Sequence, residues 1–478
     1  MSALSRDPRR AARTRARGDT GSRCLAAVDV SLGGSPQDIG LRSVAPGCAS
    51  RSQAVAAVRR LVDDPLYRGS LALLGSNVTL AGAGFVFWMI ATNSVSEQTI
   101  GRFSGINGAL TLLVAVATLG LPTVALRFLP DVGSSARVFV ANSLGAVASI
   151  GLIVSLAVAF GLSAIPGGAG DAIRAEGPLL LAGIACLLAT GSVCGAALVA
   201  GRATGSVLLA SVVSSTFKVL ALVALVQSEL RGMLAALAIG AAAQVAFACA
   251  ALWSRTDGAP ARGIAGIPSE RARFAMGSYL GGLVGCLPVA AMPLLVLSVR
   301  GPVEAAYFGT AWLIVSALGF IAGATSQAAL SEMSRRPEHL ATERRRALRY
   351  VYCVQIPLSA TVLAAAPLLM GVFGSSYAEG GTTCLRLLCL GSFAAAANYV
   401  FDAVIAVGVG GPGYFAVNAI NVALVLGGFA AGLPFGLAAA SAAWAVGQCL
   451  ALVAALLIAR RVSTSNEGEQ PWQLQVTG

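Results

Sequence analysis

The stretch Pro178–Ala200 decides the fold. It reads PLLLAGIACLLATGSVCGAALVA and contains no charged residue. A helix of about 20 apolar residues crosses the roughly 30 Å hydrocarbon core of a bilayer, so this stretch predicts a transmembrane helix. The period-two alternation of a membrane β-barrel is absent, and only helices and closed barrels satisfy their backbones in lipid. We therefore expect an all-α membrane protein.

Comparable stretches recur along the whole chain. Of its 478 residues 56% are hydrophobic and only 11% are charged, against about 25% charged in a typical soluble domain. The pattern predicts a polytopic bundle of about 12 transmembrane helices, at 71–92, 104–126, 137–161, 178–200, 205–226, 232–253, 274–299, 305–330, 348–373, 384–406, 414–432 and 435–459.

The arginines distinguish the two sides of the membrane. With the N-terminal segment placed inside, the inside segments carry 27 arginines and the outside loops carry five, which are Arg102, Arg174, Arg231, Arg300 and Arg386. Short cytoplasmic loops collect Lys and Arg, so this bias supports twelve spans with both termini cytoplasmic. It also accounts for most of the net charge of +12, and we expect no nucleic-acid partner.

The two halves of the chain share a weak pattern. Each begins with a helix, a short outside turn containing Glu, and a second helix, and the first helix of each half is interrupted at matching places by Gly82 and Gly84 or by Pro288 and Pro293. Matched interruptions of this kind point to the central site of a transporter. Chance similarity between Gly-rich apolar segments is the alternative.

Lys218, the single lysine, lies near the middle of the fifth span. Ser211, Ser214, Ser215 and Lys218 follow the spacing i, i+3, i+4, i+7 and share one helix face. A charge at the bilayer centre is costly and usually faces a bundle interior or a wet cavity. We therefore expect a cation-bearing cavity that binds substrate, with a snorkelling lysine and packed serines as the alternative.

Further polar residues lie on other spans. The second span carries Ser104, Asn107, Thr111 and Thr118 near one face, and Asn77 lies on the first span. In the second half we select Asn398, Asn421 and Asp402. The asparagines are candidates for substrate binding or for interhelical hydrogen bonds, and Asp402 is a candidate for ion coupling or for simple solvation near the cytoplasmic end.

Catalytic and metal sites are not predicted. The ten cysteines lack zinc-site spacing, the one histidine, His339, lies in an Arg-rich loop, and most cysteines fall inside apolar runs. A P-loop needs Gly-Lys before Ser or Thr, whereas Lys218 follows Phe217. We expect no metal, no cofactor and no enzyme activity.

The segment Gly120-Leu-Pro-x4-Arg127-Phe-Leu-Pro130, the turn Glu97–Phe103 and the basic loop after the eighth span carry a resemblance. With the twelve-span layout, they resemble the multidrug/oligosaccharidyl-lipid/polysaccharide flippase superfamily, in its polysaccharide-export and O-antigen flippase branch. The resemblance implies two six-helix lobes around a central cavity. It also implies flipping of a polyprenyl-pyrophosphate-linked oligosaccharide by alternating access in a bacterial inner membrane. Arg127 is a candidate gating residue, or an ordinary positive-inside anchor.

The expected organisation follows from these observations. We predict a disordered Arg-rich cytoplasmic leader (1–68), an N-terminal lobe (69–254), a linker (255–273), a C-terminal lobe (274–461) and a cytoplasmic tail (462–478). The expected partners are a lipid-linked oligosaccharide, membrane lipids and glycan-assembly proteins.

Two alternatives remain. A cation-coupled multidrug antiporter of the same fold would need acidic residues deep in the N-terminal lobe, and spans one to six have none in their interiors. A non-catalytic membrane component of a glycan-assembly complex is the other.

Overall fold

The computed structural model describes residues 65–132, 136–254, 269–335, 339–408 and 411–465. Most of the predicted leader, linker and tail therefore lies outside the described residues. Helices nevertheless extend into the predicted linker and tail, because α11 begins at Ser269 and α16 ends at Ser465.

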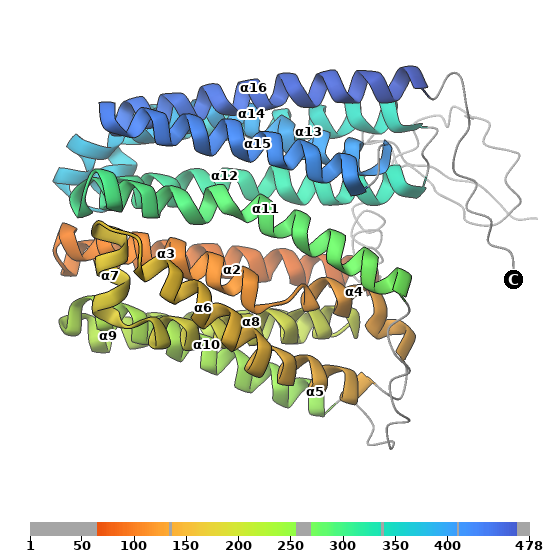
Figure 1. The fold of residues 1–478 in the computed structure, drawn as a ribbon, viewed down its shortest axis with the longest axis horizontal. Coiled ribbons are helices and arrows are strands. Elements are labelled where there is room, and N and C mark those ends of the chain that lie inside the picture. Colours follow the sequence, from red (N-terminus) through yellow and green to blue (C-terminus); the bar gives the residue numbers. More distant parts are fainter. Residues whose placement is uncertain (1–64, 133–135, 255–268, 336–338, 409–410, 466–478) are drawn as a thin grey trace, which may run out of the picture. The chain divides into compact units, whose positions relative to one another are not determined.

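Every regular element of the described residues is helical (Figure 1). The first half contains α2 (Pro65–Ser94), α3 (Glu97–Ala117), α4 (Leu121–Val132), α5 (Ala136–Ala146), α6 (Leu152–Ser163), α7 (Gly168–Glu176), α8 (Pro178–Ala200), α9 (Thr204–Leu225) and α10 (Glu229–Trp253). The second half contains α11 (Ser269–Val299), α12 (Pro302–Arg335), α13 (Leu340–Gly371), α14 (Ser375–Gly408), α15 (Gly411–Gly432) and α16 (Leu437–Ser465). A π-helical turn, Val147–Gly151, joins α5 to α6 as one span.

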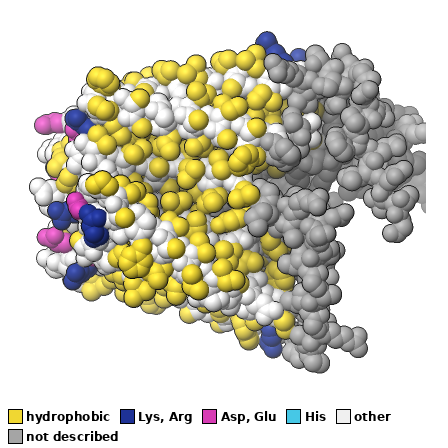
Figure 2. All heavy atoms as spheres, viewed as in Figure 1, with side chains coloured by type: hydrophobic (Ala, Val, Ile, Leu, Met, Phe, Trp, Pro, Cys, Tyr) yellow, Lys and Arg dark blue, Asp and Glu magenta, His cyan; other side chains and the backbone are white. Residues whose placement is uncertain are grey.

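The helices confirm the predicted polytopic fold. Within the described residues, 11 stretches are long and apolar enough to cross a membrane, and one of them, Thr204–Trp253, is 50 residues long and contains both α9 and α10. When α9 and α10 are counted separately, the described residues contain twelve candidate spans. Figure 2 shows a broad hydrophobic surface along the helices, with Lys and Arg at both ends and Asp and Glu at the left end, which is the distribution that a bilayer requires.

The second span differs from its prediction. It ends at Ala117 rather than at residue 126, because Leu119 and Gly120 take positive φ angles of 52° and 71° and break the helix. The separate helix α4 follows, with Val124, Ala125 and Leu129 buried, and it packs against α8. Gly120 and Pro122 are the sequence signal for this break, since Gly permits the positive φ and Pro suits the first turn of a helix.

Helix α3 connects the two halves. Helices α8, α9 and α10 pack on one another, and α12, α13, α14 and α16 form a second packed group. Between the groups, α3 packs against α8 on one side and against α11 and α12 on the other. Its first turn is capped by Ser96, whose hydroxyl accepts a hydrogen bond from the Thr99 N–H at 3.3 Å, with Glu97 following.

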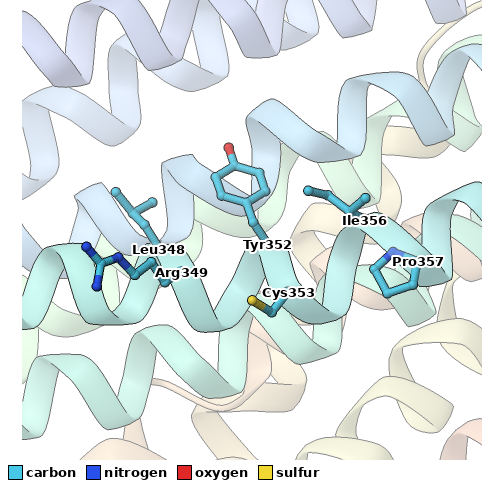
Figure 3. Close-up of a pocket in the computed structure, with 6 residues that line it drawn as sticks. All are labelled: Leu348, Arg349, Tyr352, Cys353, Ile356 and Pro357. Carbon is cyan, nitrogen blue, oxygen red and sulfur yellow. The ribbon is translucent and has the colours of Figure 1, made fainter.

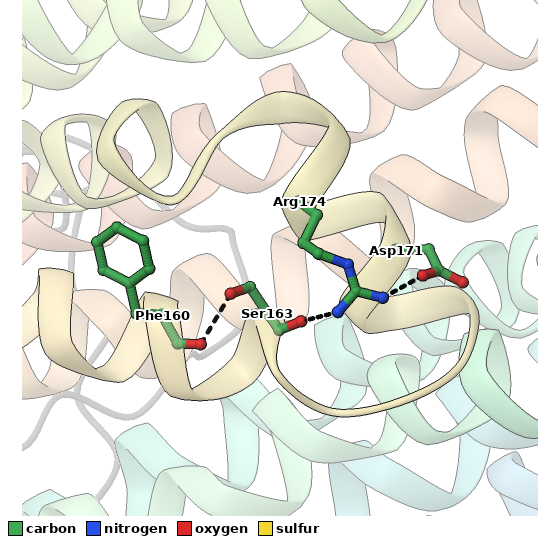
Figure 4. A network of polar contacts seen from close by, with 4 residues as sticks. All are labelled: Phe160, Ser163, Asp171 and Arg174. Atoms are coloured by element: carbon green, nitrogen blue, oxygen red, sulfur yellow. Dashed lines mark hydrogen bonds and ion pairs between the residues drawn. The ribbon is translucent and has the colours of Figure 1, made fainter.

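The short helix α7 is fastened to the end of α6. Figure 4 shows Arg174 between two partners, donating to the backbone carbonyl of Ser163 and pairing with the Asp171 carboxylate. The Ser163 hydroxyl in turn donates to the Phe160 carbonyl at 2.8 Å. The Arg174 contact gives the Ser163 carbonyl, at the last residue of α6, a hydrogen-bond partner from outside the helix.

We predict that single cysteines at Ser96, Asp171 and Ser376 react with a membrane-impermeant thiol reagent added outside intact cells. A cysteine at Thr342 should react only after the membrane is opened, because α13 begins on the inside in the twelve-span topology. A variant without native cysteines is the control. Outside labelling at position 342 would overturn this topology.

Candidate functional site

Lys218 lies where three helices of the N-terminal half meet. Its ammonium nitrogen lies 5.9 Å from the ring centroid of Phe87 on α2, within the range of a cation–π contact. On the other side, Gly240 of α10 crosses so closely that an added Cβ would lie 2.7 Å from the Lys218 Cβ. The lysine is half-buried between α2, α9 and α10.

The serines of the same face are buried. Ser211 and Ser76 share a hydrogen bond of 2.5 Å that joins α9 to α2. Ser214 is also buried, and the Ser215 hydroxyl is buried without a hydrogen-bond partner among the described residues. Helix packing of the serines is the alternative that the sequence left open, and the lysine is the member of this face that stays partly exposed.

Helix α3 is mostly buried but has an exposed polar residue, Asn107. Most of its residues from Thr99 to Leu110 are buried, but Asn107 is exposed and Thr111 is half-buried. The Thr111 hydroxyl donates to the Asn107 carbonyl at 2.9 Å. Asn77 on α2 is also exposed. The side-chain amides of Asn77 and Asn107 therefore remain available to a ligand.

An aromatic cluster, Phe87, Trp88 and Phe103, connects Lys218 to this face of α3. The Phe103 ring centroid lies 5.7 Å from that of Phe87 and 5.5 Å from that of Trp88. Phe103 lies one turn before Asn107, so the lysine and the asparagine both lie next to one buried aromatic cluster. Sequence reasoning missed this cluster, because aromatic residues inside an apolar span carry no distinct signal.

The C-terminal polar residues take different roles. Asn398 is buried and its amide donates to the backbone and side-chain oxygens of Gln448, at 3.1 and 2.9 Å. This is the interhelical hydrogen bond that the sequence offered as the alternative to substrate binding. Asn421 and Asp402 are half-buried. Substrate binding at Asn421 and ion coupling at Asp402 stay predictions.

A buried polar group in the C-terminal half was not predicted. The Gln355 amide donates to the hydroxyls of Ser359 and Ser392, at 3.3 and 3.1 Å, and links α13 to α14. A glutamine inside an apolar span was the available signal. Arg127 falls on α4, but its side chain lies outside the described residues.

The two halves make three specific contacts at the end that the sequence places outside. The Tyr307 hydroxyl donates to the Glu97 carboxylate at 3.0 Å, and the Asn93 amide donates to the Val372 carbonyl at 3.1 Å. The rings of Phe85 and Phe373 lie 5.2 Å apart, edge to face. Each contact joins α2 or α3 to α12 or to the turn between α13 and α14.

Glycines bring α3 into close contact with the other half along its length. At Gly108 an added Cβ would lie 2.5 Å from the Ala290 carbonyl oxygen and 3.4 Å from Pro293. At Gly101 it would collide with the Pro302 backbone, and at Gly105 with the Leu297 side chain. Small residues at such spacing let membrane helices approach closely.

The N-terminal half of α2, away from the contacts at Phe85 and Asn93, is more exposed. Leu71, Leu74 and Val78 are 51%, 59% and 64% exposed, whereas Phe87, Trp88 and Ala91 are buried. The C-terminal half of α2 is therefore packed, and its N-terminal half has exposed apolar side chains. No group of three or more His, Cys, Asp or Glu residues arranged to hold a metal occurs in the described part of the chain.

Comparison with known proteins shows which solved structures have a similar fold. No protein-family model and no curated protein matches the sequence. A solved structure described as the inward-facing conformation of a multidrug resistance MATE family transporter of the MOP superfamily matches with a TM-score of 0.66 and 16% identity, covering 84% of this chain and 100% of that chain. Its outward-facing counterpart matches with a TM-score of 0.60 and 17% identity, covering 86% and 99%.

A third match is a MOP superfamily transporter from Pyrococcus furiosus, described as having a binding pocket of reverse polarity that suggests a different function. Its TM-score is 0.60 at 16% identity, with 86% of this chain and 98% of that chain covered. The chain has the fold of these MOP superfamily transporters. The two-lobe MOP fold expected from the sequence is thus confirmed, and we call 71–254 the N-lobe and 269–465 the C-lobe. At 16–17% identity these matches show the fold alone, and they do not test the O-antigen flippase branch of the resemblance.

We predict that Gly108→Ala lowers the stability of the protein by about 1–3 kcal/mol, since the new methyl group must displace the Ala290 carbonyl of α11. Gly82→Ala on α2 is the matched control, because nothing lies within 4 Å of its added Cβ. That change should be neutral or stabilising by up to about 1 kcal/mol. Thermal unfolding of both variants in one detergent measures the difference. Equal melting temperatures would contradict close lobe packing at Gly108.

Proposed function

We propose that this chain is a membrane transporter that works by alternating access between its two lobes. The observation that carries the proposal is the uneven contact between the lobes. Helix α11 contacts α3 from Gly105 to Val116, and its Tyr279 also lies against Gly120 in the break after α3. Contacts of α2 and α3 with α12 and the α13–α14 turn lie at the outside end, and the inside half of α2 is exposed.

This arrangement suits rocking of two packed bodies about one line of contact. Rigid-body rotation at an interface is a common way for packed groups of helices to change state. Solved structures with this fold are described in inward-facing and in outward-facing conformations. These descriptions support the same motion here.

We propose that the cargo is an amphipathic organic compound. The matches described as multidrug transporters favour the antiporter alternative over the flippase reading. An exposed amide beside exposed apolar side chains, as at Asn77, Leu74 and Val78 on α2, suits a molecule with both polar and apolar parts.

The charge of the N-lobe favours anionic over cationic cargo. Carboxylates in its helices lie at or near helix ends, as Glu97 and Glu229 do, and Lys218 is the charged residue in the middle of a span. A partly buried ammonium attracts an anion and repels a cation at short range. The Pyrococcus furiosus neighbour, with its binding pocket described as reversed in polarity, supports variation of this kind on the fold.

A lipid-linked oligosaccharide is a second candidate for the cargo. Its pyrophosphate would pair with Lys218, and its sugar hydroxyls would accept hydrogen bonds from amides such as Asn77 and Asn107. Ion coupling, if the transporter uses an ion gradient, is assigned to Asp402, because this carboxylate lies within α14 and beside Tyr399 and Tyr414.

We predict that Lys218→Ala lowers transport of an anionic cargo at least about tenfold while the protein still folds and inserts. Removing a partly buried charge also removes its desolvation penalty. Lys218→Arg should retain partial activity, and Lys218→Glu should be the least active. Arg202→Ala, which removes a positive charge from the loop between α8 and α9, is the matched control.

The measurement uses proteoliposomes with an imposed ion gradient and no ATP. One set contains a fluorescent polyprenyl-pyrophosphate oligosaccharide, a second a fluorescent anionic dye, and a third the cation ethidium. Transport of an anion that depends on Lys218 supports the proposal. Which of the two anions is transported distinguishes the lipid-linked oligosaccharide from a smaller amphipathic anion as the cargo. Transport of ethidium alone, undiminished by Lys218→Ala, would refute anionic cargo.

A further inference from the structure

A groove on the outer face of α13 is separate from the N-lobe site. It has a volume of about 480 Å³ and is lined by Leu348, Arg349, Tyr352, Cys353, Ile356 and Pro357. Figure 3 shows these residues in a row along the helix, with Leu348 and Arg349 at one end and Pro357 at the other. All six belong to α13, so the groove runs along a single helix.

The groove is apolar except at one end. The Tyr352 hydroxyl is already engaged, because it donates to the Phe393 carbonyl at 3.1 Å. Cys353 and Ile356 are exposed, which presents sulfur and aliphatic surface. Only Arg349 brings a charge into the lining, so an occupant must have an apolar body and an anionic end.

Two arginines at this end have no partner among the described residues. Arg345 lies one turn before Arg349 on the same face, and both are exposed without an ion pair there. Their neighbours are engaged, since Arg346 lies 3.9 Å from Glu343 and Arg344 lies over the Phe401 ring at 5.9 Å. Arg345 and Arg349 together can therefore hold one phosphate.

The dimensions match one leaflet of a bilayer. From Leu348 to Pro357 the helix rises about 14 Å at 1.5 Å per residue, close to half of a hydrocarbon core of roughly 30 Å. The positive-inside topology puts the arginines at the cytoplasmic surface, where anionic lipids attract basic residues.

We propose that this groove is a binding site for an anionic phospholipid of the inner leaflet. The lipid phosphate lies between Arg345 and Arg349, and one acyl chain lies along Tyr352, Ile356 and Pro357. Charge complementarity selects the headgroup, and the apolar lining accepts any acyl chain.

The test uses the full chain with Cys353 as its single cysteine, labelled with a small fluorophore, in nanodiscs of phosphatidylcholine and phosphatidylglycerol. Either lipid is supplied with brominated acyl chains, which quench the fluorophore on contact. At equal mole fractions, brominated phosphatidylglycerol should be favoured over brominated phosphatidylcholine by about fivefold or more. Fivefold corresponds to about 1 kcal/mol, which is what one arginine contributes near an anionic surface.

Two variants make the result decisive. A fluorophore at Leu368→Cys, on the same helix and 73% exposed but distant from the arginines, should be quenched equally by both lipids. In Arg345→Gln/Arg349→Gln the preference at Cys353 should fall to less than about twofold, with total quenching by lipid unchanged. Equal quenching by the two lipids at Cys353, or a preference that survives the double substitution, would overturn the proposal.

Discussion

The close approach of α3 to α11 and α12 is the contact on which the rest of the structure depends. Lipid is as apolar as the helices, so burial of apolar surface alone does not hold two membrane lobes together. Backbone contact through Gly101, Gly105 and Gly108 supplies dense packing instead. Because these glycines have no side chains, α3 lies close to α11 and α12, and one continuous buried cluster contains side chains of both lobes, among them Phe103 and Phe308.

This constraint arranges the functional site. The aromatic cluster of Phe87, Trp88 and Phe103 lies between α2 and α3, so it is fixed by the same helix that carries the lobe contact. Lys218 lies against one side of this cluster and Asn107 follows it on α3. Asn107 directly precedes Gly108, which contacts α11, so a movement of α3 relative to the C-lobe would change access to Asn107. This couples the proposed binding surface to the lobe interface.

Hydropathy predicts the fold well, because the length of an apolar span follows from the thickness of the bilayer. The orientation that the arginines indicate stays a prediction. The twelve spans appear in the structure, and most of their ends differ by a few residues from those expected. The break at Leu119 and Gly120 was missed, since α4 remains apolar on one face and hydropathy alone does not separate it from α3.

The site was less predictable. Helical spacing correctly places Ser211 and Lys218 on one face, but which members are buried depends on α2 and α10, which are distant in sequence. The same limit applies to Asn398, whose partner Gln448 lies on another helix. A single sequence contains the polar residues but does not show which of them are hydrogen-bond partners.

Distances between spin labels on the two lobes test the central claim most directly. One pair, at Ser96 and Ser376, reports the outside end, and a second pair, at Ser254 and Thr342, reports the inside end. In proteoliposomes with and without an ion gradient, rocking about α3 and α11 predicts reciprocal changes, with the outside distance lengthening as the inside distance shortens. Two distances that stay fixed, or that lengthen together, would contradict alternating access between the lobes.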